Sequence, residues 1–449
     1  MTPETASHEG RERVSVSGLG SMPRVVKRNT LLLSAGQALY TIVAQINVLL
    51  GAFMILGLTG DVRLAGLGTA IAWGGRLLIV YHSGKLMDTL GRVRVLLLGT
   101  GLSLAGGIVV AVSLLASSLF GTVSGLVIYG LGVGATNQNR VAVADMFPTS
   151  RRGEGIGFLL TGSVLGALAA TPYVAAGSLL ATYLGYQTFA VYFGQETFGL
   201  QYDAVLWLTT TFLLVTAMIL TVAVRPDPKD IAENLSAYYP AVGKEVDPPS
   251  KDAPGNSIRV VSYPVLATFA ISGLTQGNMT MNMAFVPEVL HFHGAAVAII
   301  SIAITLHIIG MYGLSAPLGR WADRVGRRRV LMLGAAISGV GALVTPLATD
   351  FWTTTLGIFL VGLGWSAATV ASTALLSDLS QVKERGRLIG LNDFVLGAAA
   401  LIFPASGGLV LGTARNFTAL GLFGLVASIP AIFLAFRLKE KRETAALDD

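Results

Sequence analysis

The stretch that decides the fold is G-K-L-M-D-T-L-G-R, residues Gly84–Arg92, which returns as G-R-W-A-D-R-V-G-R at Gly319–Arg327. Gly, Asp, Gly and Arg hold the same four places in both copies, which begin 235 residues apart in a chain of 449. Each copy follows one long apolar segment and precedes another. A charged turn between two hydrophobic segments, repeated at half the chain length, predicts a membrane protein made of two related halves.

The composition points the same way. The chain is 53% hydrophobic and 12% charged, whereas a soluble domain has a charged fraction of about 25%. Its apolar runs reach the roughly 20 residues that cross a bilayer core of about 30 Å. We therefore expect an all-α membrane protein with twelve transmembrane helices in two six-helix halves, and two of these spans are predicted at residues 120–147 and 295–319.

The polar segments divide the chain into five parts. The linker contains P-D-P-K-D and V-D-P-P-S-K-D-A-P-G-N, which are too rich in Pro, Asp and Lys for a packed core. The predicted parts are a polar tail (1–28), the first half (29–224), the linker (225–262), the second half (263–437) and a second tail (438–449).

The positive charges predict the orientation. Of the 31 Lys and Arg residues, 27 fall on one side if the N-terminus is cytoplasmic, as the positive-inside rule requires. Both repeated turns and both termini are then cytoplasmic, in a protein that crosses the cell membrane many times. This distribution accounts for the net charge of +6 without a nucleic-acid partner, and some of the arginines are expected to contact anionic membrane lipid.

A second repeat supports the two halves. D-M-F-P-T-S-R-R-G-E-G-I-G, residues 145–157, matches D-L-S-Q-V-K-E-R-G-R-L-I-G, residues 378–390, at Asp, Arg, Gly and Gly. The G-L-G sequences at Gly130–Gly132 and Gly362–Gly364 also correspond. Repeats with the same direction predict halves related by an axis along the membrane normal.

These features together resemble the major facilitator superfamily. The turn is similar to the family's G-x-L-x-D-x-x-G-R loop between helices two and three, with Trp321 in place of Leu in the second copy. The chain departs from the family's antiporter motif G-P-x-x-G-G, since it reads T-P-Y-V-A-A from Thr171. The resemblance implies transport by rocking of the halves, a cavity lined by helices 1, 4, 7 and 10, and contact between helices 2 and 11.

The repeated turn is predicted to form two cytoplasmic gate clusters, Asp88–Arg92–Asp145 and Asp323–Arg327–Asp378. We expect Gly84 to end its span and allow close packing, and Asp88 to lie at the start of the next helix, where a carboxylate is stabilised. Simple anchoring of arginines at the membrane surface is the alternative. The predicted gate residues are Gly84, Asp88, Gly91, Arg92, Asp145, Gly319, Asp323, Gly326, Arg327 and Asp378.

Polar residues inside the spans predict the transport site, since ionisable groups there are costly and mark function. Arg76 and Asp393 come from opposite halves at matching depth, so we expect them to pair when the cytoplasmic side is closed. Asp393 is alternatively a proton carrier, with His307 a second candidate. Hydrogen bonds between helices, without a ligand, are the other reading of these polar groups. The predicted substrate or coupling residues are Gln37, Tyr40, Gln45, Arg76, Asn137, Arg140, Gln276, Asn278, Asn282, His307, Trp365 and Asp393.

The predicted function is secondary active transport of a small organic solute by alternating access, coupled to protons and leaning slightly to efflux. Facilitative or proton-symport uptake of an anionic or zwitterionic metabolite is the alternative, because Arg76 and Arg140 suit such a group. A membrane receptor and a lipid flippase are candidates from other classes. The chain lacks a P-loop, cysteines and a nucleophile–base set, so we expect no enzyme activity, cofactor or metal, and a monomer. The aromatic stretch at residues 183–202 suggests an interfacial belt, or a lid over the outer mouth.

Overall fold

The computed structural model describes residues 22–148, 151–186, 199–239, 262–348, 350–379, 382–414 and 416–438, and all regular structure there is helical. Most of the aromatic stretch at residues 183–202 lies outside these ranges. The first half comprises α1 (Arg24–Thr59), η2 (Val62–Leu64), α2 (Leu67–Leu90), α3 (Arg92–Leu115), α4 (Leu119–Thr136), α5 (Asn139–Asp145), α6 (Arg152–Tyr183) and α7 (Leu200–Val222).

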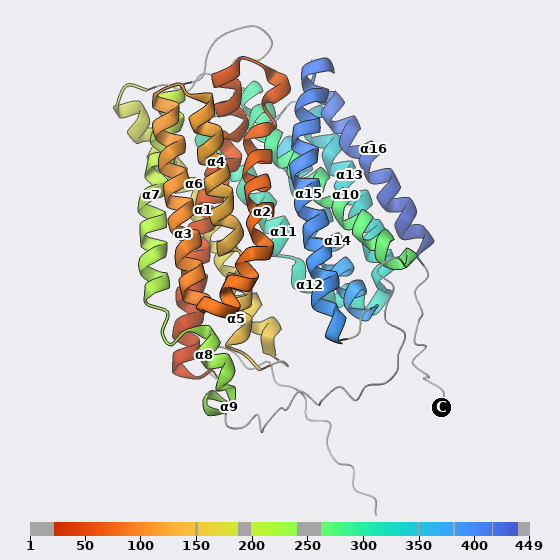
Figure 1. Ribbon diagram of the computed structural model, residues 1–449. Helices are drawn as coiled ribbons and strands as arrows, with labels where there is room; N and C mark the ends of the chain where they lie inside the picture. The colour runs from red at the N-terminus through yellow and green to blue at the C-terminus, as the bar shows by residue number, and fades with distance from the viewer. Residues whose placement is uncertain are drawn as a thin grey trace, which may run out of the picture.

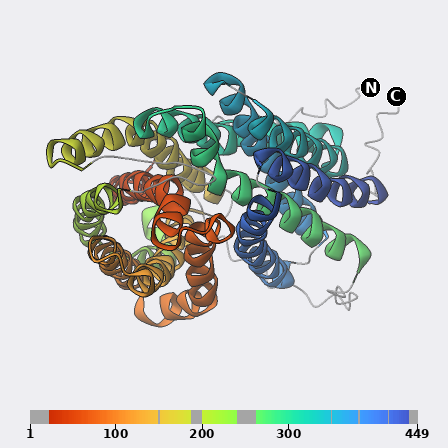
Figure 2. The ribbon, with the colours of Figure 1, turned by 90° about the horizontal axis from the view of Figure 1, so that it is seen from above.

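Two short helices, α8 (Pro228–Glu233) and α9 (Leu235–Tyr238), follow the first half. The second half comprises α10 (Tyr263–Phe292), α11 (Val297–Tyr312), α12 (Ser315–Val325), α13 (Arg327–Leu347), α14 (Phe351–Asp378), α15 (Val382–Ala414) and α16 (Phe417–Arg437). Figure 1 shows α8 and α9 below the bundle of long helices. Seen from above in Figure 2, each half gathers on its own side, and α6 lies against α11 between them.

The helices form twelve membrane-crossing units. Two units are interrupted where one unbroken span was predicted: α4 gives way to α5 at Asn137–Gln138, and α11 to α12 at Gly313–Leu314. Eleven helical segments of the described chain are long and apolar enough to span a membrane. The remaining long helix, α10, is not among them because it carries Gln276, Asn278 and Asn282.

The two halves repeat the same turn geometry. Gly91 and Gly326 have φ angles of 89° and 98°, a backbone conformation in which only glycine avoids a steric penalty. Each glycine ends one helix, and the arginine after it begins the next. The repeat seen in the sequence therefore encodes a sharp reversal between two packed helices. We call the face that carries these turns the basic face and the other end of the bundle the opposite face.

The halves are in close contact near the opposite face. A Cβ on Gly408 of α15 would lie 2.5 Å from the carbonyl oxygen of Arg63 in η2, and a Cβ on Gly66 would overlap the carbonyl oxygen of Pro404. The ring of Phe53 in α1 meets that of His291 in α10 edge-on, with centroids 5.6 Å apart. Glycine allows this approach of two backbones because it has no side chain.

A buried apolar cluster fills the space behind these contacts. It joins α1 and the η2 loop of the first half to α10, α15 and α16 of the second, so it closes the opposite face. We call it the opposite-face seal, and its buried members are Ala52, Phe53, Leu56, Ala65, Met281, Ala284, Phe285, Val289, Leu411, Phe417 and Leu420.

A larger side chain at Gly408 should hold the opposite face open. We expect Gly408→Val to expose position 52, because valine cannot fit against the Arg63 carbonyl while the halves are closed. The measurement is the rate at which a single cysteine, Ala52→Cys, reacts with a water-soluble maleimide, and the rate should rise several-fold. Gly101→Val is the matched control, since a Cβ there meets nothing within 4 Å; equal rates in both variants would contradict the prediction.

Candidate functional site

The first of the two repeated turns at the basic face contains a mostly buried ion pair. Arg92 Nε lies 2.7 Å from Asp145 Oδ2, and both side chains are mostly buried, at 13% and 20% exposure. Arg92 Nη1 also donates to the carbonyl oxygen of Met87 at 2.8 Å. The guanidinium thereby links the end of α2 to the end of α5 across the start of α3. A pair of this burial is held more firmly than an exposed one, because losing either partner leaves a poorly solvated charge.

The second half repeats this arrangement. Arg327 Nε lies 3.1 Å from Asp378 Oδ2, and Arg327 Nη1 donates to the carbonyl oxygen of Ala322 at 3.0 Å. Met87 and Ala322 hold equivalent places in the two copies of the motif. The structure thus brings together both Arg–Asp pairs named from the sequence. The side chains of Asp88 and Asp323 lie outside the described part of the molecule, so their place in the clusters stays a prediction.

Two details expected of the motif are wrong. Gly84 does not end its helix, since α2 continues to Leu90, and a Cβ on Gly84 would meet nothing within 4 Å. Asp88 lies in the last turn of α2 rather than at the start of α3. The cause is that α2 extends past the apolar run, so the helix break falls at Gly91.

The carboxylate that does stabilise the start of α3 is Asp227, which the sequence analysis missed. It accepts hydrogen bonds from the backbone N–H groups of Arg92 and Val93 at 3.0 and 2.9 Å. It also caps α8 by accepting from Lys229 N at 2.9 Å. An acidic residue directly before a proline is a typical helix N-cap signal, so α8 could have been found in the sequence. The second helix that shares this cap could not.

An ion pair joins the two halves inside the bundle. Arg140 of α5 donates through Nη2 to Asp393 Oδ2 of α15 at 2.7 Å. The Arg76–Asp393 pair was expected when the cytoplasmic side is closed; in the conformation described Asp393 pairs with Arg140 instead, so that expectation stays a prediction. Arg140 is 53% exposed and Asp393 30% exposed, so the pair is not sealed inside the bundle.

Arg76 lies beside this pair without a carboxylate of its own among the described side chains. Its guanidinium carbon stands 4.4 Å from the ring centre of Trp73, as in a cation–π contact. Arg76 also feels the charge of Arg140, the phenol of Tyr312 and the carboxylate of Asp393. Two guanidinium groups therefore share one carboxylate.

Further polar groups extend the cluster into the second half. Trp365 Nε1 of α14 donates to Gln276 Oε1 of α10 at 2.7 Å. The Trp365 ring meets the Tyr312 ring edge-on, with centroids 6.0 Å apart. We call the whole set the interhalf cluster; it comprises Arg76, Arg140, Gln276, Tyr312, Trp365 and Asp393, from α2, α5, α10, α11, α14 and α15.

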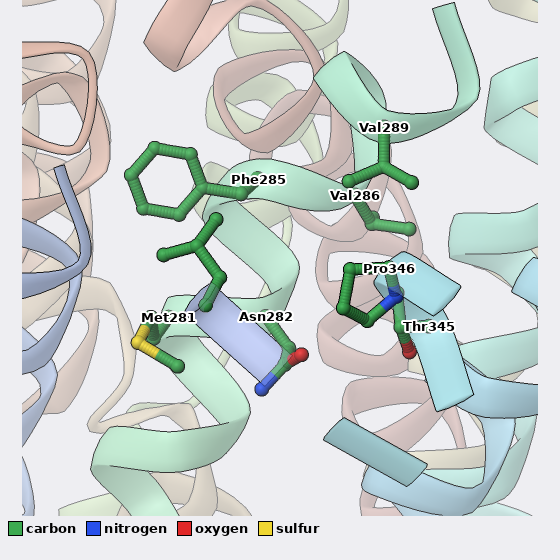
Figure 3. A pocket seen from close by; sticks show the side chains of 8 residues that line it. Met281, Asn282, Phe285, Val286, Val289, Thr345 and Pro346 are labelled. Atoms are coloured by element: carbon green, nitrogen blue, oxygen red, sulfur yellow. The ribbon is translucent and has the colours of Figure 1, made fainter. Parts of the chain in front are cut away.

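Two residues expected in the cavity lie elsewhere. Asn278 donates to Ser338 Oγ of α13 at 3.1 Å and to Ser428 Oγ of α16 at 3.4 Å. Asn282 donates to the Asn278 side chain at 3.0 Å. Asn278 therefore holds α10 to α13 and α16 within the second half, and Asn282 supports the Asn278 side chain from within α10. The small cavity beside Asn282 (Figure 3) has a volume of about 10 Å³, which admits at most one water molecule.

The other predicted site residues are spread through the bundle. His307 is fully buried between α11 and α14, where its Nδ1 contacts the carbonyl oxygen of Ile358 at 2.6 Å. Gln37 contacts Ser163 of α6 at 3.2 Å. Tyr40 packs against a buried apolar cluster that contains residues of both halves. Gln45 is buried and Asn137 partly buried, and neither has a partner for its inward amide atoms in the described chain.

The interhalf cluster is the set best placed to bind a solute. It lies between the halves, carries an excess of one positive charge and offers an indole, a phenol and an amide. A carboxylate or phosphate would neutralise the charge of Arg76, since guanidinium groups bind such groups with paired hydrogen bonds. A cationic solute would meet repulsion from two arginines.

Comparison with known proteins gives the family. The model described as Major Facilitator Superfamily matches residues 31–252 and 268–448. The uncharacterised MFS-type transporter YdeG of Bacillus subtilis is 25% identical over 90% of this chain and 90% of its own. The riboflavin transporter RfnT of Brucella anthropi is 23% identical over 93% and 98%. The inward-open xylose transporter XylE of E. coli aligns with a TM-score of 0.68 at 15% identity, covering 92% and 97%.

The shared cap at Asp227 gives a stability prediction. Asp227→Ala should destabilise the basic face, because a helix N-cap contributes about 1–2 kcal/mol and this carboxylate caps two helices. The measurement is the midpoint of heat unfolding of the purified protein, which should fall. Asp230→Ala, in the first turn of α8 and exposed, is the control and should leave the midpoint nearly unchanged; an equal fall in both variants would contradict the shared cap.

Proposed function

Because this chain belongs to the Major Facilitator Superfamily and is a secondary transporter rather than an enzyme, we propose that its solute is a small anionic or zwitterionic organic molecule. The observation that carries the proposal is Arg76, a guanidinium between the halves whose neighbours are a tryptophan ring and a second arginine. An unpaired charge at this depth is costly. A carboxylate or phosphate on the solute removes that cost when it binds.

The orientation follows from the charges. We take the basic face as cytoplasmic, with both termini inside and the protein in the cell membrane. The contacts of Gly66 and Gly408 then close the outer side in the conformation described. The relatives differ in what their names say they carry, riboflavin in one and xylose in another, and neither name assigns a solute to this chain.

We further propose that protons drive the transport, with efflux the favoured direction. Asp393 is the carboxylate that a proton would neutralise, and neutralisation would release Arg140. Arg140 would then join Arg76 in binding the solute anion. His307 suits this role less well, since its ring is packed between two helices of the same half.

Removal of the Arg76 charge tests the solute class. We expect Arg76→Gln to lower transport of anionic solutes at least about tenfold, as for loss of one charged hydrogen bond, with little effect on any neutral solute that is carried. The assay is flux into and out of proteoliposomes for a panel of carboxylates, phosphates, zwitterions and neutral compounds, with and without a pH gradient. Arg94→Gln, an exposed arginine of α3, is the control. Unaltered anion flux in the Arg76 variant would contradict the proposal.

A charge exchange tests the interhalf pair. Arg140→Asp and Asp393→Arg alone should each abolish transport, because each places two like charges between the halves. The double variant should regain part of the flux, since the ion pair is restored with reversed direction. The measurement is the same flux assay at matched protein levels, and a double variant as inactive as both single variants would contradict a role for the ion pair, because restoring the pair would not restore transport.

A further inference from the structure

One buried acid lies far from the interhalf cluster. Glu288 is the last acidic residue of α10, four residues before the helix ends at the opposite face. Its relative exposure is 0%, and neither carboxyl oxygen has a hydrogen-bond partner in the described structure. Buried polar groups are nearly always paired, so a fully orphaned carboxyl needs a physical explanation.

The acid stands within the opposite-face seal. On α10, Ala284, Phe285 and Val289 flank it, at the spacings of one helix turn or less. All three belong to the apolar cluster that joins the first half to the second. The seal is complete only when the halves are closed on this face, so the surroundings of Glu288 depend on the conformation of the protein.

The charged groups around the seal are at its rim. Asp61 and Arg63 of the η2 loop pair with each other at 2.7 Å. The rings of His291 and His293 contact the backbone carbonyls of Ala295 and Val289 at 3.1 and 2.7 Å. On the packed lengths of α1, α15 and α16 that enter the seal, the described residues are apolar or uncharged. No described cation is therefore available to Glu288.

We propose that Glu288 is a proton-binding site of the opposite-face seal, occupied when the seal is closed and emptied when it opens. Burial of an unpaired carboxylate in an apolar cluster is prohibitive, whereas the neutral acid is tolerated. Opening of the seal admits water, in which the carboxylate is the stable form. One proton therefore leaves Glu288 toward the opposite-face solution when the halves part there, and one returns before they close.

This site makes the conformational equilibrium depend on pH. If opening releases one proton, each unit of rising pH favours the open form by up to about tenfold. The inference rests on the proposed function only in that the halves must move. The Glu288 proposal needs neither a solute nor a measured flux. It can therefore fail while the proposal on transport stands, and the proposal on transport can fail while the Glu288 proposal stands.

The test measures the opening directly. The chain has no cysteine, so spin labels at Phe120→Cys of α4 and Thr413→Cys of α15 report the distance between the halves at the opposite face. Both positions are exposed. Without solute, the population with the longer distance should grow as pH rises. In Glu288→Gln, which imitates the protonated acid, the short distance should persist at every pH, and Glu288→Met should behave alike.

Three controls separate Glu288 from other titrating groups. Asp350→Asn changes an exposed carboxylate near the same face and keeps a capping side chain for Thr353 N, so the pH response should remain. His291→Gln and His293→Gln should also leave it in place. The proposal is overturned if the label distances in the protein with Glu288 intact do not change with pH, or if Glu288→Gln responds to pH as that protein does. It is also overturned if the pH response disappears in either the His291→Gln or the His293→Gln variant.

Discussion

A charge inside a bilayer needs a partner of opposite sign, and this constraint governs the centre of the molecule. Asp393 of α15 receives its partner, Arg140, from the other half of the chain. A pair that spans both halves exists only while they are close at that depth, so it couples a local ion pair to the position of whole bundles. Arg76 adds a second guanidinium, and no second acid accompanies it among the described side chains. Under the proposed function a solute completes this charge balance, which would tie binding to the same contact that depends on conformation.

The turns of the basic face fix the ends of neighbouring helices to one another, unlike the ion pair at the centre, which joins the two halves. Arg92 joins three helix ends through Asp145 and the carbonyl of Met87. Asp227 then binds the linker helix α8 to the first turn of α3. Because α8 follows the last helix of the first half, the start of the linker is fixed to one half before the chain crosses to the other. Such anchoring favours motion of each half as a unit over bending within it.

The architecture could be predicted from the sequence because corresponding residues of the two halves recur at nearly constant offsets along the chain. Equal offsets of Gly91 and Gly326, and of Asp145 and Asp378, are visible without coordinates, and the Arg–Asp pairs follow from them. The contacts between side chains inside the bundle were harder to predict. Position along a helix gives depth but not rotation, and Arg76 and Arg140 lie at similar depth, so depth alone could not tell which one reaches Asp393. The break between α4 and α5 also has no strong local signal.

A helix that is buried on all sides limits in a second way what the sequence can predict about contacts. Asn278 and Asn282 share one face of α10, as their spacing predicts, yet that face meets α13 and α16 rather than a cavity. Nearly every residue of α10 beyond Ile271 is buried, so apolar periodicity is lost and a polar stripe does not reveal which neighbour it faces. Gln276 and Trp365 belong to different helices, α10 and α14, which meet where these two side chains are hydrogen-bonded.

The two ends of the bundle are held by different kinds of interaction, and this difference has a mechanical consequence. Ion pairs at the basic face weaken with salt and with protonation of their acids. The opposite-face seal is held by apolar burial and by backbones in contact at Gly66 and Gly408, which salt and pH hardly alter. A seal of this kind alone would ignore the proton gradient across the membrane. Among the described residues Glu288 is the one acid placed within it, and the free energy of burying its carboxylate is large enough to make an otherwise apolar closure depend on a proton.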